Sequence, residues 1–228
     1  SRRRHTRYIS VTGVQTCALP ISAVLVVAVV FAAMHWQAAR AEAEAGFWFD
    51  VSTWELPAAE TARFGGPLTA AEATRIQQVA RDALRRAFSG LRITFTDNRQ
   101  AFWRLAVRRD LQIDTRGPYV GAPSGVAESR PLGPLGGVAS VSFLSLAQYA
   151  INLAPPGTSR GEMIDGMGRG IARAAAHELG HLIAVGGSHS EDDVNSYEYR
   201  YANRPSQYYG ALHWNSLRPA LEARLGAS

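Results

Sequence analysis

The 228-residue sequence has no lysine, a single cysteine, and no methionine beyond Met167. Without lysine, every basic side chain other than histidine is an arginine, which we interpret as the codon bias of a GC-rich genome. The single cysteine, Cys17, excludes an intrachain disulfide and a cluster of thiolate metal ligands. The apolar run at residues 23–33 is shorter than the roughly 20 residues that a membrane-spanning helix needs.

Residues 1–22 resemble translated adapter sequence rather than protein. The run VTGVQTCALPIS at 11–22 resembles one frame of a common short-read sequencing adapter, and SRRRHTR at 1–7 resembles the outer part of that adapter. We expect this segment to be an artefact that makes no defined contact with the folded protein; a basic signal-peptide n-region is the alternative. Because Cys17 lies here, the genuine protein would have no thiol for a disulfide, a metal ligand or a latency switch.

The next segment, residues 23–43, has the features of a signal peptide that has lost its basic start. Its apolar core has the length of an h-region, and Ala39, Ala41 and Ala43 supply small residues at alternating positions, as signal peptidase requires. We expect a secreted or periplasmic bacterial protein, with residues 44–228 as the mature domain. The alternative is an uncleaved membrane anchor, the one arrangement in which we expect contact with a membrane.

The charge of the chain gives no sign of a nucleic-acid partner. From Glu42 onward, 19 arginines balance 19 acidic residues. The formal net charge of +5 therefore comes from the arginines that precede Glu42, which are Arg2, Arg3, Arg4, Arg7 and Arg40. A hydrophobic content of 46% is typical of a globular domain. We expect no binding to nucleic acid.

Residues 44–228 alternate between patterns typical of strands and of helices. Alternation of apolar and polar residues predicts four strands, at 47–55, 91–96, 102–107 and 138–146. A first helix is predicted to begin at Thr69, which stands three residues before Glu72 as in a capping box. The stretch 116–137 is rich in glycine and proline and is expected to be a loop. A short last helix is expected at 215–225.

A second long helix is predicted from Ser159, where Ser159 and Glu162 repeat the capping-box spacing, to the pair Gly186 and Gly187. Each glycine inside a helix costs about 1 kcal/mol relative to alanine. This helix contains several near its start, namely Gly161, Gly166, Gly168 and Gly170. Either its first turns are irregular, or it packs very closely on the sheet.

The run HELGH at residues 177–181 indicates a metal site with a general base beside it. On a helix, His177 and His181 lie one turn apart on the same face, so both imidazoles can bind one metal ion. Zinc lowers the pKa of a coordinated water to about 7, and Glu178 can reach that water without binding the metal. We therefore predict Zn²⁺ as the cofactor and Glu178 as the general base in peptide-bond hydrolysis. Two purely structural histidines are the alternative.

The segment HELGHLIAVGGSH, residues 177–189, resembles the HExxHxxGxxH motif of the metzincin clan, which includes matrixin-like enzymes. It matches at the two helical histidines and the glutamate, but Ala184 and Gly187 stand where the clan has glycine and the third histidine. The resemblance covers residues 69–190 as an order of elements. It implies an α+β zincin fold: a small twisted sheet, a backing helix, an active-site helix and a short C-terminal subdomain that ends in a helix.

The third metal ligand has several candidates. The resemblance implies a histidine, and His189 takes that place if the turn after the helix is two residues longer than in the clan. A gluzincin-like site, in which a downstream carboxylate is the third ligand, is the alternative, with Glu198 first and Asp193 or Asp192 behind it. His213 is a further alternative. Zinc accepts imidazole and carboxylate ligands alike, so the chemistry leaves them open.

Three further features of the sequence bear on the site. The clan has a methionine turn below its zinc, and because no methionine follows Met167, we expect another segment, such as 197–199, to fill that place. Tyr197 and Tyr199 are possible oxyanion donors, although tyrosines near a site more often pack at the rim of a cleft. The strand predicted at 138–146 is either the edge strand that pairs with extended substrate, as in the clan, or an internal strand.

Together these features predict a zinc-dependent endopeptidase that acts on protein or peptide substrates. A non-catalytic zinc-binding module is one alternative, although a site that only holds metal has no need of a base such as Glu178. A hydrolase of non-peptide amides is another.

Overall fold

The computed structural model describes residues 42–111, 127–131, 136–184 and 189–228. All of the described residues belong to one compact unit, Glu42–Ser228. The segment that resembles adapter sequence, the apolar core of the signal peptide and the glycine pair after the second long helix lie outside the described residues.

The described strands form one five-stranded sheet in the order β2-β1-β3-β5-β4. Four of them are parallel, and β4 at one edge is antiparallel to β5. The strands are β1 (Ala43–Asp50), β2 (Ile93–Thr96), β3 (Trp103–Arg108), β4 (Ala127–Pro131) and β5 (Gly137–Ser142). The register places Phe47, Leu105 and Ala139 in one row across the sheet, where all three belong to the buried core.

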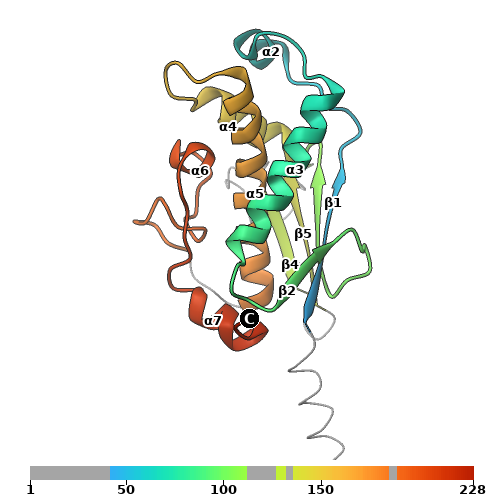
Figure 1. Cartoon of the computed structure of the whole chain (residues 1–228), viewed down its shortest axis with the longest axis vertical. Coiled ribbons are helices and arrows are strands. Elements are labelled where there is room, and N and C mark those ends of the chain that lie inside the picture. Colours follow the sequence, from blue (N-terminus) through green and yellow to red (C-terminus); the bar gives the residue numbers. More distant parts are fainter. Residues whose placement is uncertain (1–41, 112–126, 132–135, 185–188) are drawn as a thin grey trace, which may run out of the picture. The chain divides into compact units, whose positions relative to one another are not determined.

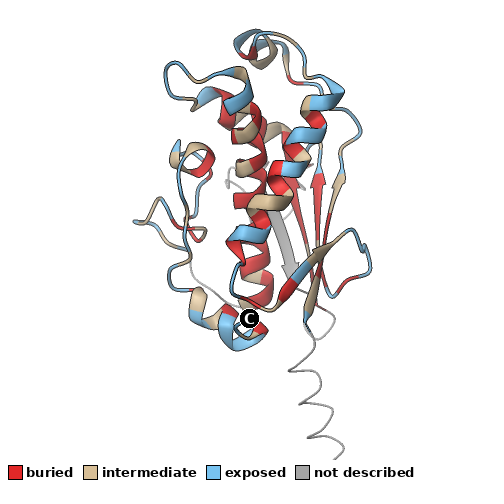
Figure 2. Cartoon of the chain, viewed as in Figure 1, coloured by how far each residue is buried: buried red, intermediate tan, exposed pale blue. Residues whose placement is uncertain are grey.

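The longest helix of the described part is α5, and most of the other helices pack against it. The described helices are α2 (Ala58–Phe64), α3 (Ala70–Ala87), α4 (Phe143–Asn152), α5 (Arg160–Ala184), α6 (Ser206–Tyr209) and α7 (Arg218–Leu225). Figure 1 shows α3 beside α5 on one face of the sheet, and α5 also packs against α4, α6 and α7. Figure 2 shows α5 buried over most of its length. The predicted α+β class is confirmed.

Both predicted capping boxes are present. The Thr69 hydroxyl accepts from the backbone N–H of Glu72 at 3.2 Å, and the Glu72 carboxylate accepts from the N–H of Thr69 at 2.8 Å. Ser159 and Glu162 make the same exchange at 3.2 and 2.7 Å. These bonds satisfy N–H groups that the first turn of a helix leaves without partners. Helices α3 and α5 therefore begin where the sequence predicted.

Glycines in α5 mark places where neighbouring elements approach its backbone. A Cβ added at Gly168 would lie 2.8 Å from the Ile76 carbonyl oxygen of α3, and one at Gly170 would lie 2.3 Å from the Tyr208 ring of α6. Helix α5 is continuous from its first turn, so the prediction of irregular first turns is wrong. Close packing is confirmed, but at these two glycines it is against α3 and α6 rather than the sheet.

Several predicted boundaries are corrected. Strand β1 begins at Ala43, inside the predicted signal peptide, and ends at Asp50. The stretch expected to be a loop contains β4, and the strand expected at 138–146 ends at Ser142, where α4 begins. The Ser142 hydroxyl accepts from the N–H of Ser145 at 3.2 Å and so caps α4. Because β5 lies between β3 and β4, it is an internal strand.

Three helices were not predicted, and the last helix is shorter than expected. The three are α2, α4 and α6, while α7 begins at Arg218 rather than at residue 215. In the described part of the chain, none of the helices combines the length and the apolar character needed to span a membrane.

Candidate metal centre

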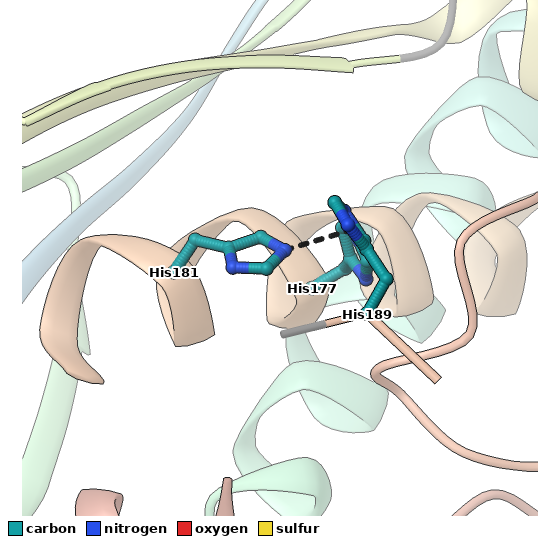
Figure 3. Close-up of side chains that lie close together, drawn as sticks. All are labelled: His177, His181 and His189. Carbon is teal, nitrogen blue, oxygen red and sulfur yellow. Dashed lines mark hydrogen bonds between the residues drawn. The ribbon is translucent and has the colours of Figure 1, made fainter. Parts of the chain in front are cut away.

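Two histidines project from the last turns of α5 toward a common point. His177 and His181 are four residues apart, so the 3.6-residue helical period places them on one face. Their Nε2 atoms face one another at 3.2 Å, as the dashed line in Figure 3 shows. His177 is 6% exposed, whereas His181 is half-buried at the edge of the site.

A third histidine approaches the pair from the segment that follows α5. The ring centroid of His189 lies 5.1 Å from that of His177 and 4.7 Å from that of His181. The three rings lie close together in Figure 3, and one ligand nitrogen from each lies within 4.8 Å of the other two. His189 is exposed, so the group opens to solvent on that side. These three histidines are close enough together to bind one metal ion.

The three imidazoles are donors that zinc accepts, and the spacing of the two helical histidines fits that ion. With zinc–nitrogen bonds of about 2.0–2.1 Å, two ligands of a tetrahedral ion lie about 3.3–3.4 Å apart, close to the 3.2 Å between the two Nε2 atoms. Burial lowers the pKa of His177 well below 6.5, with a further lowering by the charge of Arg173, and burial also lowers the pKa of His189. Both rings are therefore neutral near pH 7, the form in which imidazole binds a metal.

The backbone of Tyr197 fixes the orientation of His177. Its carbonyl oxygen lies 2.8 Å from Nδ1 of His177. Because a carbonyl oxygen only accepts, Nδ1 carries the proton, and Nε2 is left with its lone pair toward His181 and His189. This bond selects the tautomer and the ring orientation that a metal ligand needs.

Glu178 lies beside the histidine group on the same buried stretch of α5. One of its carboxylate oxygens is 3.9 Å from Nε2 of His177, and the residue is only 9% exposed. The carboxylate does not belong to the group of three metal-ligand candidates. Glu178 therefore lies beside the group without being one of its ligand candidates, and its role as the general base stays a prediction.

The structure does not bring the alternative ligands to the histidines. Glu198 is fully buried, and its two carboxylate oxygens accept from the backbone N–H groups of residues 215–217 at 2.7–3.0 Å. Asp193 pairs with the other alternative, His213, through Oδ2 and Nε2 at 2.8 Å. Asp192 is exposed. Among the described residues, only His189 joins His177 and His181 in a possible metal site.

The tyrosines singled out in the sequence pack near the site. The Tyr197 ring lies against Trp214, with ring centroids 5.0 Å apart, and Tyr199 is 4% exposed beside Tyr201. Burial raises the pKa of the Tyr197 hydroxyl. The backbone carbonyls of Tyr197 and Tyr199 accept hydrogen bonds from side chains of α5.

Arg173 belongs to the same site but has no place in the motif. It lies one helical turn before His177, is 3% exposed, and donates from its guanidinium to the Tyr199 carbonyl. A charged side chain within the alanine-, glycine- and isoleucine-rich buried stretch of α5 is the sequence signal that would have revealed it. No sequence signal marks the Tyr197 carbonyl, because every residue has a backbone carbonyl.

Searches against protein-family models and against curated proteins find no match to this chain.

Proposed function

We propose that the chain is a zinc-dependent peptidase of the metzincin type, with His177, His181 and His189 as the zinc ligands and Glu178 as the general base. The observation that carries the proposal is the convergence of three imidazoles beside a buried glutamate that is not one of them. A catalytic zinc site uses three protein ligands and leaves the fourth position open. The exposed side of the group at His189 is consistent with such access.

The arrangement of the fold supports the metzincin assignment over the gluzincin-like alternative. The elements follow the order that the resemblance implies: a backing helix, strands, then the helix with the histidines. The carboxylate that a gluzincin-like site would use, Glu198, has both oxygens bonded to the backbone that leads into α7. The third ligand of the proposed site is therefore His189.

The roles of the chain's own residues follow from their placement. When bound, zinc supplies a Lewis acid that polarises a peptide carbonyl and makes water nucleophilic near neutral pH. Glu178 takes the proton from the attacking water and passes it to the amine that leaves. The Tyr197 carbonyl keeps the Nδ1 proton of His177 in place, so that Nε2 stays available as a ligand.

Secretion or export to the periplasm is part of the same proposal and rests on the signal-peptide pattern of residues 23–43. Protein or peptide substrates would then be met outside the cytoplasm. Membrane attachment through an uncleaved segment remains the alternative arrangement.

The proposal is tested with Glu178→Gln and a matched control, Glu222→Gln. Glu222 is an exposed glutamate of α7 that pairs with Arg218. We expect all three proteins to hold one zinc per chain, and we expect Glu178→Gln to lose hydrolysis of an unfolded protein substrate by at least about 10³-fold. The control should keep the wild-type rate. Zinc-loaded Glu178→Gln with wild-type turnover would show that the proposed function is wrong.

A further inference from the structure

The turn formed by residues 196–199, which we call the backing turn, connects two of the metal-site histidines. The Tyr197 carbonyl accepts from Nδ1 of His177 at 2.8 Å. The next carbonyl, that of Glu198, accepts at 3.0 Å from the backbone N–H of the residue that follows His189. The turn is itself closed by a 3.2 Å hydrogen bond between its first and last residues. One short turn therefore sets the position of a ligand on α5 and of a ligand on the segment beyond it.

Arg173 holds the end of the backing turn. Its guanidinium donates to the Tyr199 carbonyl from a position one helical turn, about 6 Å, before His177. The side chain is 3% exposed, and its Nε has no hydrogen-bond partner within the described part of the chain. Burial lowers the pKa of the guanidinium to about 10, so the group is still charged at neutral pH. A buried arginine carries a large desolvation cost that an apolar side chain here would avoid.

Glu198 holds the same turn through its side chain. The carboxylate is fully buried and accepts from three consecutive backbone N–H groups, at residues 215, 216 and 217, and also from the Ser216 hydroxyl. These residues lead into α7, which packs against α5. The turn is therefore fixed by two buried charged groups that make separate sets of hydrogen bonds and do not belong to the group of three ligands.

We propose that Arg173 and Glu198 are positioning residues, which hold the backing turn so that His177 and His189 keep the geometry that binds the metal. They act through the carbonyl oxygens of the turn and do not touch the metal. The inference rests on the proposed function for the identity of that metal as zinc. This role gives a reason for the burial of Arg173 in α5, one helical turn before His177. It also gives a reason for the burial of Glu198 in the backing turn.

The chain offers a close control for Arg173. Arg169 lies one turn earlier on α5 and donates at 2.5 Å to the backbone carbonyl of Tyr208, outside the backing turn. Zinc dissociation constants of the full chain are measured with zinc chloride against a chromophoric chelator, for wild type, Arg173→Met, Arg173→Lys, Glu198→Gln and Arg169→Met. Loss of an outer partner of a metal ligand typically costs 10–100-fold in affinity.

We expect Arg173→Met and Glu198→Gln to bind zinc about 10–100-fold more weakly than wild type. Arg173→Lys keeps a charge and a donor, so it should recover part of that loss, and Arg169→Met should stay within about threefold of wild type because it leaves the turn untouched. If Arg173→Met and Glu198→Gln fold and bind zinc within about threefold of wild type, the inference is wrong. An equal loss of zinc affinity in Arg169→Met would also overturn the inference, since the effect would then not depend on the backing turn.

A measurement on the unmutated, metal-free chain covers the case in which a variant does not fold. A ¹H–¹⁵N correlation of the imidazoles reports which nitrogen of His177 carries the proton. The inference expects a protonated Nδ1 in wild type and in Arg173→Lys, and a mixture of tautomers in any folded variant that frees the turn. A wild-type His177 with its proton on Nε2 would overturn the inference without any variant.

The two proposals fail in different ways. In one outcome, wild type binds zinc tightly and the variants bind it more weakly as expected, while neither wild type nor any variant hydrolyses a peptide bond. In that case the proposed function is wrong and the positioning role stands. If wild type hydrolyses peptides with Glu178 as base while Arg173→Met and Glu198→Gln bind zinc as wild type does, only the positioning role is wrong.

Discussion

The carbonyl oxygen of Tyr197 lies 2.8 Å from Nδ1 of His177, and this one contact joins the helix of the site to the turn beneath it. It places the ring proton on Nδ1 and leaves Nε2 to face the other histidines. A helix with two histidines at this spacing binds a metal only when both rings present the right nitrogen, so the contact is part of the site as much as the histidines are.

His189 and His213 form a matched pair for testing the third ligand. Both histidines follow α5 in the sequence, but only His189 joins the group of three, whereas His213 pairs with Asp193. We predict that His189→Ala weakens zinc binding by at least about 100-fold, because a catalytic site needs three protein ligands. His213→Ala should keep zinc affinity within a few fold of wild type. Chelator competition measures both, and the reverse order would contradict the assignment.

The buried His177 ring gives the metal-free chain a specific pH dependence. Burial, reinforced by the charge of Arg173, lowers the pKa of His177 below its ordinary 6.5, so below that pH the unfolded chain binds a proton that the folded chain does not. Metal-free protein should therefore lose stability as the pH falls below 6.5, by at most about 1.4 kcal/mol per pH unit from this group. Urea unfolding at several pH values, compared with His177→Asn, isolates the slope. Equal slopes in the two proteins would contradict the prediction.

Gly168 and Gly161 test the close packing of α5. A Cβ at Gly168 would lie 2.7 Å from Cβ of Val79 and 2.8 Å from the Ile76 carbonyl, whereas a Cβ at Gly161 meets nothing within 4 Å. We predict that Gly168→Ala destabilises the fold by about 1–3 kcal/mol through overpacking. Gly161→Ala should be neutral or stabilising by up to about 1 kcal/mol, since alanine is the better helix former. Thermal unfolding measures the stability change in each variant. Equal changes in Gly168→Ala and Gly161→Ala would contradict the prediction.

The start of α3 supplies a prediction at acid pH. The Arg160 guanidinium donates to both oxygens of Glu72 and lowers the pKa of that carboxyl to about 2, with help from Thr69. A lowered folded pKa gives stability that is present above the unfolded value near 4.5 and is lost as the pH falls toward 2. Because this pair lies near the surface, Glu72→Gln should cost only about 1 kcal/mol at pH 7. The difference in unfolding free energy between wild type and Glu72→Gln should shrink below pH 4. Urea unfolding at several pH values measures it, and a difference that does not change with pH would contradict the prediction.

Features set by neighbouring residues could be predicted from the sequence, and features set by contacts between distant segments could not. Thr69 with Glu72 and Ser159 with Glu162 were recognised because a capping box depends on spacing alone. The pair His177 and His181 was recognised for the same reason. Strand β4 was missed because it lies at the sheet edge within a glycine- and proline-rich stretch and ends at a proline, which an edge strand tolerates.

The start of α4 shows how a short apolar run can mislead. Phe143 to Leu146 continues the pattern of β5, and four residues do not separate a strand from a buried helix. The buried positions Phe143, Leu146, Ala147, Ala150 and Ile151 show the helical period only when the run is followed further. The backing turn was expected only as a segment near the site, because its contacts with His177 and Arg173 are made by backbone carbonyls that leave no mark in the sequence.

Zinc K-edge absorption spectroscopy of the full chain loaded with one equivalent of zinc tests the metal centre most directly. The account predicts three imidazole nitrogens at about 2.0–2.1 Å and one oxygen from solvent, with one imidazole fewer in His189→Ala and no change in His213→Ala. A wild-type spectrum with only two imidazoles and a protein carboxylate, or a chain that binds no zinc, would contradict it.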